Sequence, residues 1–347
     1  MPEGTEMSAT GVLRSREIFI NFAVWKLSEQ LMKDEKLLND EIRRQAESLA
    51  SGKDLREGTA EAPYGTRGGR VCRVRPDVMT VDDIVSAVPR LGNHRKLVER
   101  LMRMLWLDKV NHVHGKYCYE EGIPFSHLLV EDQFRIKLRI DGEENLARFA
   151  EGPFITVSNH PFGALDGILL LHIVGTYRED FRVMVNMILN YLSAMRPSFI
   201  AVDPSKSDDP AKRRATMQGI KEAMRHIRDG HPMGFFPAGA VAKVSRDLRI
   251  RDREWQPSVI RLINQMKVPV IPIYFHGHNG TFFNILGMID WRLRTLRLPR
   301  ELFNKTGQEV HVSIGKPIMP ERQAEFTDLE SFGKFLREST DRLRSIK

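Results

Sequence analysis

The residues with the clearest potential for chemistry lie in one short segment, FITVSNHPFGALDG, residues 154–167. Its β-branched and aromatic beginning predicts a buried strand that ends at Ser158, and an apolar helix follows the segment. His160 and Asp166 flank the Gly-containing turn between them. A carboxylate that holds one ring nitrogen of a histidine fixes its tautomer and stabilises its imidazolium, so the other nitrogen can remove a proton from a hydroxyl. The pattern therefore predicts general-base chemistry.

The spacing alone leaves a structural alternative open. Asp166 can cap the helix that follows it, and His160 can hydrogen-bond the turn. A His–Asp pair also supports serine nucleophiles elsewhere, but the sequence has no Gly-x-Ser-x-Gly elbow to supply one. We therefore expect the reacting hydroxyl to belong to the substrate.

Strands and helices alternate from about Gly152 onward. Short apolar runs predict strands at 154–157, 181–185, 199–202, 233–236 and 268–275. Longer amphipathic segments, of which 209–228 is the plainest, predict helices between them. Connections of that length are crossovers, which join parallel strands. We expect an α/β fold with a mainly parallel sheet flanked by helices over residues 148–320.

The rest of the chain divides by composition. Residues 1–78 are expected to be a polar, partly helical or disordered extension that ends in a Gly- and Pro-containing linker. Ile18, Phe22 and Trp25 share one helical face there, which suits loose docking on the protein or contact with a membrane surface. We expect residues 79–147 to be a helical N-terminal segment and residues 321–347 a C-terminal helix.

The amino-acid composition limits the classes of protein to which the chain can belong. Hydrophobic residues make up 41% and charged residues 28% of the chain, which is typical of a folded, water-soluble protein. No apolar run approaches the ~18 residues of a spanning helix, and the acidic start MPEGTEMSAT is unlike a secretory signal. Two cysteines, Cys72 and Cys118, define no disulfide framework or thiolate zinc site, which suggests a reducing compartment.

The net charge of +8 suggests an acidic partner, such as nucleic acid, anionic lipid or an acidic carrier protein. Nucleic acid is disfavoured because the aromatic residues are not interleaved with basic ones as a stacking platform requires, and no known nucleic-acid-binding signature is present. The stretch DWRLRTLRLPR, residues 290–300, mixes arginines with apolar residues. It suits either a solvated helix packed on the core or a surface that faces anionic headgroups.

Four blocks in order resemble those of the PlsC-like glycerolipid and lysophospholipid acyltransferase superfamily. They are NHPFGALD (159–166), FIAVDP (199–204), FFPAGAVAKV (235–244) and VPVIPIYFHG (268–277). The resemblance covers about residues 148–318. It implies transfer of a fatty acyl group from acyl carrier protein or coenzyme A to a lipid hydroxyl. It places this reaction peripherally at the cytoplasmic face of the inner membrane, without metal, cofactor or covalent enzyme intermediate.

The same resemblance implies roles for individual residues. His160 is the general base and Asp166 its partner. Backbone amides near the third block are implied stabilisers of the tetrahedral oxyanion. The residues expected to line the acceptor or thioester site are Asn159, Phe162, Gly163, Phe236, Pro237, Gly239 and Lys243.

Two departures from the usual blocks bear on the substrate. Five residues, rather than the usual four, separate the His from the Asp. Ala238 and Val241 stand where the usual third block has Glu and Arg, and that arginine is associated with the phosphate of glycerol-3-phosphate acceptors. Losing a guanidinium that can bind phosphate bidentately should weaken a phosphate-bearing acceptor, unless Lys243 or Arg246 reaches back.

These variant blocks, together with DREWQPS (252–258), look most like the O-acyltransferases that complete bacterial glycine lipids and their ornithine-lipid relatives. The implied acceptor is the 3-hydroxyl of an N-(3-hydroxyacyl) amino acid, whose carboxylate is its only anionic group. A 1-acylglycerol-3-phosphate acyltransferase and a non-catalytic lipid-binding module stay open as alternatives.

Two groups of histidines are close in sequence but do not predict a metal site. One comprises His112, His114 and Cys118, and the other His276 and His278. Neither brings a fourth ligand at a recognisable spacing.

Overall fold

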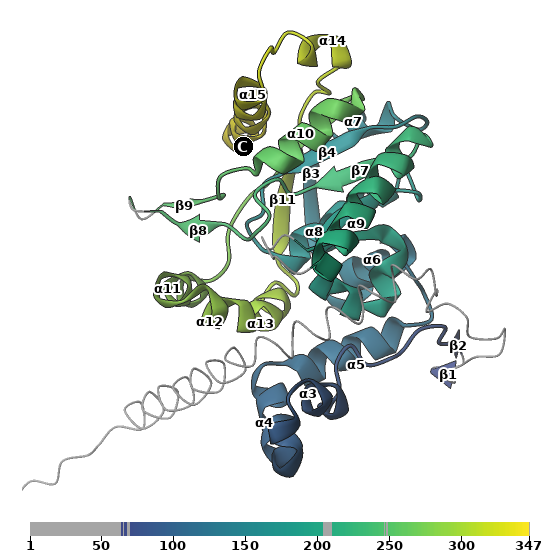
Figure 1. Ribbon diagram of the computed structural model, residues 1–347, viewed down its shortest axis with the longest axis vertical. Helices are drawn as coiled ribbons and strands as arrows, with labels where there is room; N and C mark the ends of the chain where they lie inside the picture. The colour runs from purple at the N-terminus through teal and green to yellow at the C-terminus, as the bar shows by residue number, and fades with distance from the viewer. Residues whose placement is uncertain are drawn as a thin grey trace, which may run out of the picture.

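The computed structural model describes residues 64, 66–67, 70–203, 210–245, 247 and 249–346 (Figure 1). Most of the expected extension at 1–78, including Ile18, Phe22 and Trp25, lies outside these residues, as does Arg246. The described end of that extension forms a short antiparallel pair, β1 (Thr66–Arg67) and β2 (Arg70–Val71).

A seven-stranded sheet with the order β3-β11-β10-β4-β7-β5-β6 lies at the centre of the molecule. Every neighbouring pair is parallel except β10 and β11. The expected α/β fold with a mainly parallel sheet is therefore confirmed. The strands are β3 (Lys137–Asp141), β4 (Ile155–Ser158), β5 (Arg182–Asn186), β6 (Phe199–Val202), β7 (Met233–Phe235), β10 (Val270–Phe275) and β11 (Glu309–Ile314).

Two of these strands, β3 and β11, are absent from the sequence-based expectation. Both alternate apolar residues with charged or polar ones, as in KLRID and EVHVSI. They lie at one end of the sheet, where β3 is the edge strand. Strands that are buried on both faces have continuous apolar sequences, whereas half-exposed strands such as these two do not. The sheet therefore includes β3 from the segment that was expected to be helical.

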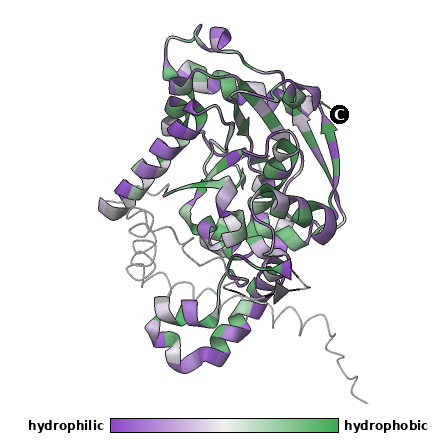
Figure 2. Ribbon diagram, turned by 90° about the vertical axis from the view of Figure 1, so that its right-hand side faces the viewer, coloured by the Kyte–Doolittle hydropathy of each residue, from purple (hydrophilic) through white to green (hydrophobic). Residues whose placement is uncertain are grey.

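Helices cover both faces of the sheet. One face packs on α6 (Ile123–Leu128), a short π-helical turn called η2 (Leu129–Gln133) and α8 (Ala164–Gly175). The other packs on α9 (Pro210–Arg228), α10 (Pro257–Met266) and α15 (Leu329–Arg342). In Figure 2 hydrophilic and hydrophobic residues alternate along the outer helices, as amphipathic packing requires. In contrast α8 is buried on nearly every side, and each of its fully buried leucines contributes about 2 kcal/mol.

The remaining elements lie before, between and after these layers. None of the helices among the described residues has the length and apolar composition needed to cross a lipid bilayer. The remaining elements are α3 (Val81–Ala87), η1 (Pro89–His94), α4 (Arg95–Met104), α5 (Leu107–Tyr117), α7 (Glu144–Ala147), η3 (Met187–Tyr191), η4 (Ser193–Ser198), β8 (Lys243–Val244), β9 (Ile250–Arg251), α11 (Thr281–Ile289), α12 (Trp291–Leu296), α13 (Leu298–Phe303), α14 (Pro320–Gln323) and η5 (Leu343–Ser345).

A disulfide joins Cys72 to Cys118, with the two Cα atoms 5.3 Å apart. The expectation that these cysteines form no disulfide was therefore wrong. They are 46 residues apart, and only the docking of the segment before α3 on the end of α5 brings them together. Because disulfides persist mainly in oxidising surroundings, the pair removes the cysteine-based support for a reducing compartment.

Candidate active site

His160 and Asp166 meet just beyond the carboxyl end of β4. Nδ1 of His160 lies 2.9 Å from Oδ2 of Asp166. The same carboxylate oxygen accepts hydrogen bonds from the backbone amides of Phe162 and Gly163, each at 2.9 Å. Asp166 therefore both caps α8 and faces the imidazole, so its position is compatible with the structural alternative and with the catalytic one. Asp166 is fully buried while the side chain of His160 is 17% exposed, which leaves the imidazole as the group within reach of a substrate.

The position of this loop in the sheet follows from strand direction. β4 runs parallel to both of its neighbours, β10 and β7, so the carboxyl ends of all three strands lie at one edge. The first, third and fourth sequence blocks follow or contain these ends. This edge is where open α/β sheets bind their ligands.

Gly163 sets the path of the chain between the two residues. Its φ is +89°, and a Cβ there would lie 2.9 Å from Cδ2 of Leu298 and 3.1 Å from Cγ2 of Val241. Only glycine combines this backbone conformation with so little space. Gly163 thus shapes the loop, and it donates its amide to Asp166.

Burial raises the pKa of Asp166. The imidazole of His160 opposes that rise, as do the amides of Gly163 and Phe162. A buried carboxylate with these partners can stabilise a positive charge that develops on the imidazole. The arrangement suits a base that takes up and then returns a proton.

Asp252 is a second carboxylate at this loop and is absent from the residues predicted from the sequence. Its Oδ1 accepts a hydrogen bond from the backbone amide of His160 at 3.1 Å, and its Oδ2 accepts one from Nε1 of Trp255 at 3.2 Å. Burial raises the pKa of Asp252 to about 6. The sequence signal that points to it is the motif DREWQPS, residues 252–258, which begins with this aspartate.

The raised pKa of Asp252 predicts a pH-dependent stability. The folded-state value of about 6 exceeds the ordinary value of 3.8, so the folded chain binds more protons between these two pH values. The stability that comes from this group is fully present below about pH 4 and is lost as the pH rises through 6. Asp252→Asn removes the titrating group. We therefore expect the variant to lose up to about 3 kcal/mol of the change in free energy of unfolding across this pH range. Urea unfolding from pH 4 to 7.5 measures the free energy of unfolding of the parent protein and the variant. Identical pH profiles for the two proteins would contradict the prediction.

The turn after β7 lies against the imidazole. The ring of Phe236 packs beside His160 with their centroids 4.4 Å apart. Pro237 is buried, and its carbonyl accepts a hydrogen bond from the amide of Gln256 at 2.9 Å. Gly239 is exposed with a φ of +65°, and its amide donates to the carbonyl of Phe236 at 2.9 Å. Because that amide already has an acceptor, Gly239 is a poor candidate for oxyanion stabilisation.

Asn159 and Phe162 have contacts that hold the loop in place. The side chain of Asn159 donates to the carbonyl of Phe275 at 2.9 Å and accepts from its amide at 2.7 Å, which ties the loop to the end of β10. Phe162 is buried, and Nζ of Lys305 lies 4.7 Å from its ring centroid. A direct contact of either residue with substrate stays a prediction.

Lys243 begins β8, and its side chain is exposed. The preceding residue, Ala242, donates its amide to the carbonyl of His160 at 2.8 Å. The backbone of this segment therefore reaches the site, and a contact of the Lys243 side chain with substrate stays a prediction.

Arg294 is buried and Arg297 pairs with a buried carboxylate. Neither alternative for residues 290–300, a solvated helix face or a surface toward anionic headgroups, describes these two side chains. The buried guanidinium of Arg294 donates to the carbonyls of Val241 at 2.9 Å and Ala242 at 3.0 Å. Arg297 pairs with the buried Glu301 at 3.1 Å. Buried carbonyls and a buried carboxylate need donors, and these arginines supply them.

The two histidine groups from the sequence do not converge. His114 is buried, with Nδ1 2.8 Å from the carbonyl of Pro76, while His112 is exposed and Cys118 is in the disulfide. His276 places Nε2 2.8 Å from Oγ of Ser313 and stacks on His311.

Comparison with known proteins decides the family. A family model described as an acyltransferase matches residues 89–346, well over half of the chain. The chain belongs to this acyltransferase family. The match takes in both the helical segment from η1 onward and the α/β domain, so it extends beyond the blocks quoted above. The prediction that the protein is an acyltransferase enzyme is confirmed.

Two curated relatives are similar to this acyltransferase. The lyso-glycine lipid O-acyltransferase of Bacteroides thetaiotaomicron is 28% identical over 229 residues, which is 64% of this chain and 80% of that protein. The lyso-glycine lipid O-acyltransferase of Phocaeicola vulgatus is 26% identical over 261 residues, 72% of this chain and 90% of that protein. The crystal structure of the 1-acyl-sn-glycerophosphate (LPA) acyltransferase PlsC from Thermotoga maritima aligns with a TM-score of 0.41 and 14% identity, over 72% of this chain and 88% of that one.

Proposed function

We propose that this acyltransferase moves a fatty acyl group from an acyl thioester to the 3-hydroxyl of an N-(3-hydroxyacyl) amino acid, such as the glycine derivative, in bacterial membrane-lipid synthesis. The observation that carries the proposal is the set of arginines around the His160 loop, where one is missing and another is placed differently. Val241 stands where phosphate-binding relatives have arginine. Arg253 follows Asp252, which contacts the backbone of His160, and among the described residues the buried Nε of Arg253 has no hydrogen-bond partner. The names of the two curated relatives support the glycine headgroup.

The proposed reaction has one proton carrier. His160 takes the proton of the acceptor hydroxyl as the oxygen attacks the thioester carbonyl carbon, and Asp166 stabilises the imidazolium that forms. When the tetrahedral intermediate collapses, the C–S bond breaks and the imidazolium returns the proton to the leaving thiolate. The products are an ester and a free thiol, and the chemistry needs no cofactor beyond the thioester co-substrate.

Arg253 is the proposed partner of the acceptor carboxylate. It follows Asp252, whose carboxylate accepts from the amide of His160. In the part of the chain that the structure describes, the buried Nε of Arg253 has no hydrogen-bond partner. Arg294, which holds the carbonyls of Val241 and Ala242, has a pKa lowered by burial and by the charge of Arg253, so the two guanidinium groups are neighbours. One guanidinium matches a carboxylate of charge −1 better than a phosphate monoester of charge close to −2.

A direct comparison of acceptors tests this function. The full-length protein is incubated with acyl-carrier-protein thioester or acyl-coenzyme A and with either N-(3-hydroxyacyl)glycine or 1-acylglycerol-3-phosphate, and products are quantified by mass spectrometry. We expect kcat/KM to favour the glycine acceptor by at least ~10-fold. Preference for the phosphate acceptor would overturn the substrate assignment. Absence of transfer to both, with binding retained, would favour a lipid-binding module instead.

Removing the guanidinium should act mainly on acceptor binding. We expect Arg253→Gln to raise KM for the glycine acceptor by about 10- to 100-fold, because a charge-assisted hydrogen bond to a carboxylate contributes about 1.5–3 kcal/mol. KM for the thioester should change little. Arg261→Gln, which removes an exposed guanidinium on α10, is the matched control. Equal KM values for the two variants would contradict the role of Arg253.

The proposed membrane contact is made by α11. Its exposed apolar side chains repeat at helical spacing, and they are Phe282, Ile285, Met288 and Ile289, which are 42%, 43%, 57% and 71% exposed. Figure 1 shows α11 beside β8, with α12 and α13 leading toward the N-terminal helices. Since β8 directly follows the segment that contacts His160, α11 lies near the site. A lipid surface covers such a face and brings the acceptor with it.

Charged residues on this face should weaken membrane binding. We expect the double variant Ile285→Asp, Ile289→Asp to bind phosphatidylglycerol-containing vesicles at least ~10-fold more weakly in co-sedimentation, because two apolar side chains no longer insert. Met217→Asp provides the control, since Met217 is a similarly exposed apolar residue on α9. Equal vesicle binding by both variants would exclude α11 as the contact.

A further inference from the structure

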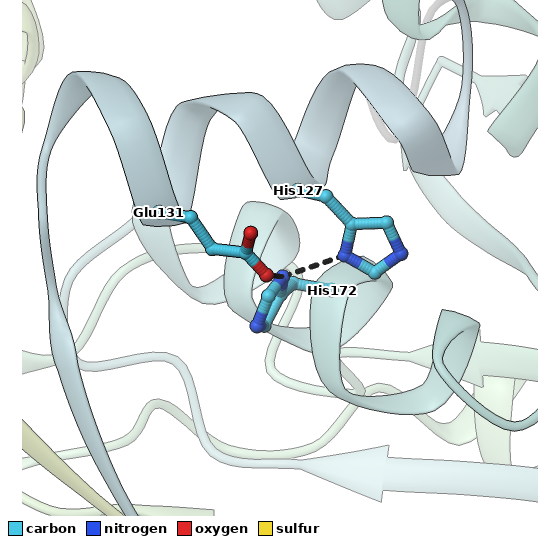
Figure 3. A group of neighbouring side chains, drawn as sticks. All are labelled: His127, Glu131 and His172. Carbon is cyan, nitrogen blue, oxygen red and sulfur yellow. Dashed lines mark hydrogen bonds and ion pairs between the residues drawn. The ribbon is translucent and has the colours of Figure 1, made fainter.

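Three side chains of metal-binding type converge between α6 and α8. His127 lies in α6, Glu131 in η2 and His172 in α8. One ligand atom from each lies within 4.8 Å of the other two. Figure 3 shows His127 and Glu131 reaching from one helical segment toward the ring of His172 on the other. His172 is six residues beyond Asp166 on α8, about 9 Å along the helix axis, so the cluster lies apart from the active site.

The three ligand atoms lie close together. Nδ1 of His127 lies 2.7 Å from Nδ1 of His172, and Oε1 of Glu131 lies 4.0 Å from the same nitrogen of His172. The two ring planes are nearly perpendicular, at 77°. A single proton between the nitrogens satisfies only that pair and leaves the carboxylate without a partner there. A cation can satisfy both nitrogens and the carboxylate oxygen together.

We infer that His127, Glu131 and His172 bind one divalent d-block cation, for which Zn²⁺ is the best match. Zn²⁺ takes imidazole nitrogen and carboxylate oxygen at about 2.0–2.2 Å in tetrahedral geometry, which places neighbouring ligand atoms about 3.3 Å apart. The observed 2.7 and 4.0 Å separations lie on either side of that value, so small side-chain rotations complete the site. Mg²⁺ and Ca²⁺ prefer oxygen ligands and fit this set poorly.

The backbone supports the same assignment. Glu131 lies in the π-helical turn η2, and π-helical turns are rare and occur frequently at functional sites. The side chain of Glu131 is 70% exposed, which leaves the fourth coordination position open to water. The bound ion would join α6 and η2 to α8, the helix whose first turn contains Asp166. Its role is therefore structural, and it does not depend on the identity of the acyl acceptor.

The test uses the tag-free full-length protein after treatment with chelator and dialysis. Titration with Co²⁺ should produce the visible absorption of a tetrahedral site that saturates at one ion per chain and is displaced by Zn²⁺. Zn²⁺ should also raise the thermal midpoint. We expect His127→Ala and His172→Gln to lose the absorption, and Glu131→Gln to bind Zn²⁺ at least ~10-fold more weakly.

His112→Ala is the matched control, because it removes an exposed histidine of α5 from outside the cluster. It should bind metal as the parent protein does. Absence of stoichiometric Co²⁺ absorption in the parent protein would overturn the inference and leave a simple hydrogen bond between two histidines. Retention of the absorption in both histidine variants would overturn it equally, since the ion would then lie elsewhere. Acyl transfer is measured separately, so neither result depends on the proposed acceptor.

Discussion

Replacing His160 with alanine should lower kcat/KM by about 10³-fold while leaving the fold intact. The imidazole is the exposed member of the pair, and general-base catalysis of this kind contributes about 10²–10⁴-fold. The side chain packs beside Phe236 and has its charged partner in Asp166. Its removal therefore takes away the base and little of the core.

The measurement is the initial rate of thiol release with saturating thioester and varied acceptor. Near-ultraviolet circular dichroism and the thermal midpoint report whether the variant folds. His112→Ala again serves as control, because this histidine is exposed and lies on α5. Full turnover by His160→Ala would refute the proposed mechanism.

Two substitutions at Asp166 should separate its charge from its hydrogen bonds. In Asp166→Asn the amide oxygen can still accept from Phe162 and Gly163, so stability should stay close to that of the parent protein. The negative charge beside the imidazole is lost, so the positive charge that forms there during catalysis is no longer stabilised. We expect kcat/KM to fall about 10²-fold.

Asp166→Ala should lose stability as well as activity. It leaves the amides of Phe162 and Gly163 without their acceptor in a buried loop, at a cost of about 1–3 kcal/mol for each. Urea unfolding of the two variants at one pH makes the comparison. Equal stability of the Asn and Ala variants would show that capping by Asp166 matters little. Unchanged kcat/KM in the Asn variant would show that the charge of Asp166 does not act on His160.

The strands of the sheet were predictable where they are buried on both faces. Residues 154–157 and 268–275 are continuous apolar runs because helices cover both sides of the sheet there. β3 and β11 were missed because each has a partly polar face. Burial of both faces leaves a mark in the local sequence, whereas half-exposure leaves a pattern that short loops and helices share.

Residues around the candidate site were predictable only within one segment. Asp252 and Arg253 lie more than 80 residues from His160 in the chain, and no spacing rule connects them. Both alternatives for residues 290–300 placed the arginines at the surface, yet Arg294 is buried against two carbonyls. The buried carbonyl groups need hydrogen-bond donors, and this need decided the orientation of Arg294. The composition of the segment does not predict it.

The sequence by itself determined the α/β class, the acyltransferase blocks and the His160–Asp166 pair, because each depends on residues close together in the chain. Only the tertiary structure decided which distant groups meet. It placed Asp252 on the backbone of His160, joined Cys72 to Cys118 across 46 residues and brought His127 to His172 across 45. The physical reason is that such contacts depend on how strands and helices pack, and packing brings together residues whose separation along the chain carries no signal.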